Sequence, residues 1–144
     1  MRGDEGSALV EFLGVTLVLL VPVVYLVLVL GRVQAATFAV DAAAREAARA
    51  VVTSAGDRTG TGADERVAAA VGLALADQGL RDAPTAVDVA CAGECLAPGT
   101  SVTVTVSVDV ALPGVPGWLQ EVVPLAVPVS ATTTAEVDTY VAAR

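Results

Sequence analysis

A continuous apolar run near the N-terminus constrains this chain more than any other feature. No charged residue occurs between Phe12 and Leu30, and the run ends at Gly31-Arg32. These 19 residues, as a helix that rises about 1.5 Å per residue, match the roughly 30 Å hydrocarbon core of a bilayer. The sequence therefore predicts one membrane-spanning helix over residues 7–31.

Glu11 lies at the front edge of this run, directly before Phe12. An unpaired carboxylate carried to the centre of a membrane helix costs about 2.5–3.5 kcal/mol, so Glu11 is expected to have a cationic partner. A cut between Gly6 and Ser7 would supply that partner, because Ser7 would then carry an α-amino group that is charged at neutral pH. Ser7 and Glu11 share one face of a helix and can pair within a chain or between neighbouring chains.

The segment from Gly6 to Phe12 resembles the processing site of type IV prepilins, in which a small residue precedes the cut and Glu follows at the fifth position. With its short leader and the later Gly31-Arg32, about the first 50 residues resemble the TadE/TadF-like minor pseudopilins of Tad (Flp) pilus systems. The resemblance implies a leader over residues 1–6, cleavage after Gly6 by a prepilin peptidase, and a role for Glu11 and Phe12 in assembly and register. The implied partners are the lipid bilayer, the peptidase, and other pilus, pseudopilin and assembly-platform subunits.

Two other interpretations share part of this pattern. An unprocessed signal anchor would hold Glu11 at the headgroup level and would carry a small accessory or binding domain. A pseudopilin of a type II secretion system would share the processing site. Each interpretation predicts a single-pass protein of the cytoplasmic membrane, with its N-terminus in the cytoplasm and its C-terminal domain outside it.

Beyond Arg32 the helical pattern continues and becomes amphipathic, so one long helix is predicted from about Ser7 to Ser54, with residues 32–54 outside the membrane. Its apolar stripe recurs at three- and four-residue spacing and consists of Val33, Ala36, Val40, Ala44, Ala47 and Val51. A second helix is predicted over about residues 62–78. Thr61 to Asp64 approximates a capping box at its start, and Gly79 suits its end.

The hydrophobic period changes to two after Pro84. Residues 102–110 alternate strictly between Val and polar residues, and weaker alternation occurs over residues 87–91 and 125–137. Pro128 makes the last run an edge or bulged strand, and half-polar strands are typical of antiparallel sheets. The predicted fold class is therefore α+β: a long N-terminal transmembrane, pilin-like helix, a second helix and a small three-stranded antiparallel sheet. Residues 62–144 would form the small extracytoplasmic domain.

The chain contains two cysteines, Cys91 and Cys95. A location outside the cytoplasm would permit a disulfide between them, which would close a small loop and stabilise less than a long-range bridge. Two free thiols are the alternative. A zinc site is disfavoured because structural zinc takes four ligands and the chain has no His or further Cys, so no metal site is predicted.

The composition leaves little room for chemistry. The chain contains no His and no Lys, so the commonest general base and the usual activators of a Ser or Thr nucleophile are absent. Its net charge of −8 and its lack of a basic patch disfavour nucleic acid as a partner. We therefore predict no enzyme activity, no catalytic residue, no cofactor and no small-molecule substrate.

The segment from Pro113 to Pro124 is the least polar loop of the chain and contains Trp118 and Leu119. It would either cover the open end of the sheet core or provide an apolar contact. That contact would be with a neighbouring subunit or with the outer lipid surface, where Trp is favoured.

Overall fold

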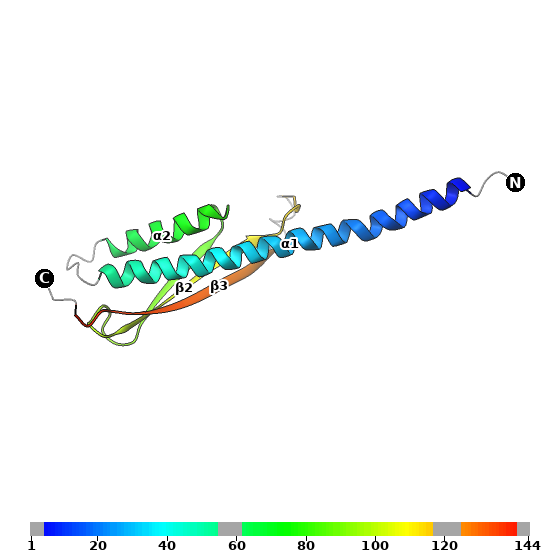
Figure 1. The fold of residues 1–144 in the computed structure, drawn as a ribbon. Coiled ribbons are helices and arrows are strands. Elements are labelled where there is room, and N and C mark those ends of the chain that lie inside the picture. Colours follow the sequence, from blue (N-terminus) through cyan, green and yellow to red (C-terminus); the bar gives the residue numbers. More distant parts are fainter. Residues whose placement is uncertain (1–4, 55–61, 117–124, 141–144) are drawn as a thin grey trace.

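The computed structural model describes residues 5–54, 62–116 and 125–140. Over these residues the fold is α+β, as predicted, with two helices followed by three strands. The elements in chain order are α1 (Glu5–Thr53), α2 (Ala63–Asp77), β1 (Thr85–Cys91), β2 (Ser101–Ala111) and β3 (Ala126–Glu136). Figure 1 shows that the N-terminal half of α1 extends away from every other element.

Helix α1 is 49 residues long and would extend over about 74 Å at 1.5 Å per residue. It continues through Pro22, although proline has no amide hydrogen to donate to the preceding turn. The described side chains from Ala8 to Leu28 are all exposed, whereas buried side chains begin at Ala36. One helix therefore has an uncovered apolar half and a half that packs on the rest of the protein.

The C-terminal half of α1 lies between α2 and the sheet, and packs on β2 and β3 (Figure 1). The predicted stripe is confirmed: Val33 is partly buried and the other members are buried. Most of the buried α1 residues are alanines, which allow the neighbouring backbones to approach closely. The valines that they face from β2 are at most 2% exposed, namely Val102, Val104, Val106, Val108 and Val110.

The sheet is antiparallel throughout, with the order β1-β2-β3. Strand β3 is an edge strand, as Pro128 predicted. The face turned away from α1 is polar. On that face, Thr103 and Thr134 lie opposite each other in the register, and their hydroxyl oxygens are 3.1 Å apart. The alternation in β2 is therefore explained by one face covered by α1 and one solvated face.

Strand β1 differs from the other two because both its faces are largely exposed. Val87 and Val89 lie opposite the buried Val106 and Val104 of β2, yet they are 38% and 43% exposed. The reason is the position of α1, which packs on β2 and β3. The alternating pattern correctly predicted the strand but could not show that the helix leaves this part of the sheet uncovered.

The two ends of α2 are capped in different ways. The capping box expected at Thr61 is wrong: the N-cap residue is Gly62, which has no side chain with which to cap. The acidic first turn of Asp64 and Glu65 still complements the helix dipole. At the other end Gly79 adopts a φ of +71°. Leu80 N–H then donates to the Leu75 carbonyl at 2.9 Å, as in a Schellman motif.

Candidate functional site

The segment predicted to be processed forms the start of α1. This helix begins at Glu5, so the peptide bond between Gly6 and Ser7 lies in its first turn. The first four N–H groups of a helix have no intrahelical partner, so this turn is held by fewer hydrogen bonds than the turns that follow. An enzyme that needs an extended peptide would therefore unwind the helix at its least stable end.

Glu11 is exposed and lies one turn after Ser7 in the same continuous helix, so helix geometry puts the two positions on one face. The helix dipole acts mainly within the first turn and offers little to a carboxylate in the second. The next basic residue after Glu11 is Arg32, about 30 Å further along the helix axis. If the chain began at Ser7, its α-amino group would therefore be the nearest cation to Glu11 in the same subunit.

Among the described residues, α1 is the one helix long and apolar enough to cross a membrane. None of its most apolar stretch is buried by the other described residues. Fifteen of the 19 residues from Phe12 to Leu30 are Leu, Val or Phe, and each favours insertion by about 0.3–0.6 kcal/mol. The total, roughly 5–9 kcal/mol, exceeds the cost of about 2.5–3.5 kcal/mol for one carboxylate at the helix centre. Glu11 therefore does not prevent insertion.

The comparison with protein families agrees with this geometry. Residues 6–49 match the family model of TadE-like proteins. This N-terminal segment is TadE-like. The match includes Gly6, Glu11 and the whole apolar run, and it ends within the half of α1 that packs on the sheet. It confirms the resemblance noted in the sequence and covers just under a third of the chain. No curated protein and no solved structure shows a significant match.

TadE-like proteins are in general non-enzymatic proteins of pilus assembly. The TadE-like match ends before α2 and the sheet, so these elements are known here from the structure alone. Within the described ranges, no group of three or more His, Cys, Asp or Glu side chains is placed to hold a metal ion.

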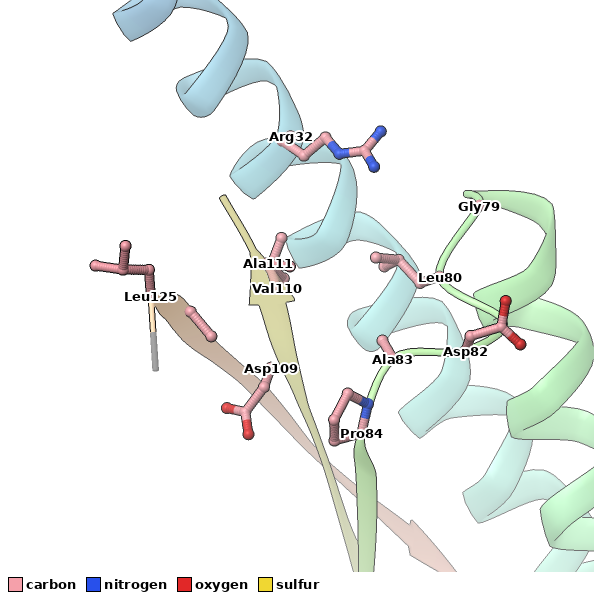
Figure 2. Close-up of a pocket in the computed structure, with 11 residues that line it drawn as sticks. Arg32, Gly79, Leu80, Asp82, Ala83, Pro84, Asp109, Val110, Ala111 and Leu125 are labelled. Carbon is pink, nitrogen blue, oxygen red and sulfur yellow. The ribbon is translucent and has the colours of Figure 1, made fainter. Parts of the chain in front are cut away.

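A cavity of about 520 Å³ lies where the apolar half of α1 meets the domain (Figure 2). It is lined by Arg32 of α1, by the connection from α2 to β1, and by the adjoining ends of β2 and β3. In Figure 2 the side chains of Asp82 and Asp109 point outward on opposite sides of it. The sequence does not predict this cavity, because four distant segments form it and no local pattern places Arg32 beside the other three.

The predicted cysteine pair lies at the opposite end of the sheet from this cavity. The structure joins Cys91 and Cys95 by a disulfide, with Cα atoms 5.3 Å apart. Cys91 is the last residue of β1, and the amide of the next residue, Ala92, donates to the Ser101 carbonyl at 3.0 Å. The bridge therefore closes the start of the connection between β1 and β2.

The other predicted contact residues, Trp118 and Leu119, lie outside the described residues. Their expected role in covering the core or in making an apolar contact stays a prediction. The described residues before them, from Leu112 to Pro116, follow β2 at the end of the sheet that carries the cavity.

Proposed function

We propose that this protein is a membrane-anchored minor pseudopilin that takes part in the assembly of a Tad/Flp-type pilus. A prepilin peptidase processes it after Gly6. The TadE-like match over residues 6–49 is the observation that carries the proposal. The exposed apolar half of α1 supports it, because this half is long enough to span a bilayer and its most apolar stretch is not buried by any of the described residues.

The proposed mechanism assigns one task to each part of the segment. Gly6 is the small residue before the cut, which allows the peptidase to act, and Ser7 becomes the new N-terminus. Its amine pairs with Glu11 of the same or a neighbouring subunit, which fixes the register between helices. The apolar run keeps the subunit in the cytoplasmic membrane, with the N-terminus on the cytoplasmic side, until assembly-platform subunits engage it.

The deciding experiment determines the N-terminal residue of the protein extracted from native membranes, by intact mass and sequencing. We expect Ser7. Gly6→Leu should abolish the cut, since it replaces the small residue before the scissile bond. The matched control is Gly14→Leu, also in α1, where an added Cβ meets nothing within 4 Å, and this variant should be processed normally. A start at Met1 in the presence of active peptidase would contradict the proposal.

The unprocessed anchor is the alternative, and the composition of residues 1–5 favours it: they contain one Arg and two acids, whereas cytoplasmic flanks of membrane helices are usually basic. It predicts that Met1 is retained and that the domain binds its partner without entering an assembly. A pseudopilin of a type II secretion system would be cut in the same way. It would differ in the subunits that crosslink to it in the membrane.

A further inference from the structure

The connection that follows β2 approaches the apolar half of α1. A Cβ added at Gly114 would lie 4.0 Å from Cε2 of Tyr25. Tyr25 is inside the apolar run, five residues before its last residue, Leu30, and this distance along the helix axis is about 7.5 Å. The domain therefore does not stop where the apolar run stops, because part of it extends alongside the run.

This part of the connection has the chemistry of a lipid contact. Its described residues after β2 are Leu112, Pro113, Gly114, Val115 and Pro116, which include no charged or polar side chain. The Leu112 amide donates to the Leu125 carbonyl at 3.2 Å, which closes the base of the connection. Gly114 has a φ of +77°, so the chain turns there, next to Tyr25.

We propose that the described start of this connection, residues 112–116, lies in the headgroup layer of the outer leaflet, and that Tyr25 marks the outer boundary of the hydrocarbon core. Irregular backbone exposed to lipid does not occur within the hydrocarbon region, because its polar groups would be unsatisfied. If Leu30 were the boundary, Gly114 would lie inside that region. Tyr is enriched at the membrane–water interface, so Tyr25 suits the boundary better. The inference rests on the proposed function only in requiring that α1 crosses a membrane.

The thickness of a bilayer agrees with this placement. The headgroup layers add about 10–15 Å to a core of about 30 Å, or roughly 5–7.5 Å on each side. The distance from Tyr25 to Leu30 along α1, about 7.5 Å, therefore matches one headgroup layer. The apolar residues from Leu112 to Pro116 are thus in contact with the same bilayer that α1 crosses.

If Tyr25 marks the outer boundary of the hydrocarbon core, the inner boundary lies closer to the N-terminus of α1. A span of about 20 residues that ends at Tyr25 begins near Gly6. Glu11 then lies about 7.5 Å inside the inner edge of the hydrocarbon core, where a carboxylate without a partner is costly. Placing residues 112–116 in the outer headgroup layer thereby raises the free-energy cost of an unpaired Glu11 carboxylate on the inner side, where a neighbouring cation would offset it.

The test measures depth with a fluorophore in the full-length protein, reconstituted into phosphatidylcholine vesicles that contain nitroxide-labelled phosphatidylcholine. An environment-sensitive dye is attached to P116C, V18C or T139C in turn. Pro116 and Thr139 are both exposed in the structure, and Thr139 lies beside Gly99 at the other end of the sheet. Wild-type protein without reductant reports any labelling of Cys91 and Cys95.

We expect the P116C and V18C dyes to be blue-shifted and quenched several-fold more strongly than the T139C dye. Quenching at V18C with none at P116C would overturn the inference while α1 remains a membrane helix. Quenching at neither would overturn the membrane anchor of the proposed function itself. Equal quenching at P116C and T139C would place the whole domain on the lipid surface, and would also overturn this assignment.

Discussion

Glu11 is the residue of the N-terminal segment whose charge is least expected beside a membrane-spanning run. Glu11 is adjacent to a run that favours the membrane by several kcal/mol, and it follows Ser7 by one helical turn. Insertion does not need this charge and is opposed by it. Under the proposed function Glu11 takes part in a contact that forms after insertion, and a pairing with an α-amino group is such a contact.

Glu11→Gln separates insertion from assembly. The neutral side chain should leave the amount of membrane-inserted protein unchanged or slightly higher. It should weaken association with other subunits, because a hydrogen bond to a charged group contributes about 1.5–3 kcal/mol, or on the order of ten- to hundredfold in affinity. Crosslinking in native membranes measures that association. Glu46→Gln is the control, since Glu46 is an exposed residue whose carboxylate lies 3.9 Å from Arg49. Equal crosslinking by Glu11→Gln and wild type would refute the pairing.

At the scale of elements, β2 is the central strand of the domain. It pairs with a strand on each side, and α1 covers one of its faces. Burial differs sharply between neighbours on this face: Val104 is fully buried, while Val89, directly opposite in β1, is 43% exposed. The two valines therefore share a register position and differ mainly in how much α1 covers them.

Truncation of these two valines should have unequal effects. Val104→Ala removes buried methyl groups and leaves a cavity against α1, which should lower the free energy of unfolding of the domain by roughly 1.5–3 kcal/mol. Val89→Ala should cost less than half as much, because its side chain is already half in water. Hydrogen exchange of the β2 amides in the full-length protein measures both. Similar losses for both variants would mean that β1 is covered in solution.

Elements with a strong local period were predictable from the sequence. The Val alternation of β2 and the stripe of α1 both result from burial on one face, and a periodic pattern records such burial directly. The exposure of β1, the cavity beside Arg32 and the approach of Gly114 to Tyr25 depend on how elements pack together. No local pattern encodes that packing. In the candidate site, the segment from Gly6 to Phe12 could be singled out from the sequence because its residues are contiguous, and its processing stays a prediction.

At the scale of the whole molecule, the disulfide is expected to report on which side of the membrane the domain lies. Disulfides persist in oxidising compartments, and this one closes a loop short enough that it contributes only about 2 kcal/mol. In native membranes Cys91 and Cys95 should therefore resist alkylation until a reductant is added, and the domain should be digested by a protease added from outside. Rapid alkylation without reductant, together with protection from that protease, would show the opposite orientation.

The continuity of α1 has a mechanical consequence. The same helix is the part exposed for lipid and the middle layer of the domain, between α2 and the sheet (Figure 1). A force that draws the helix outward would act on the domain through one continuous helix from Glu5 to Thr53, in which Pro22 lacks one backbone hydrogen bond. The apolar half and the folded half are therefore coupled through one helix, so a piston-like displacement imposed on the apolar half would also displace the domain.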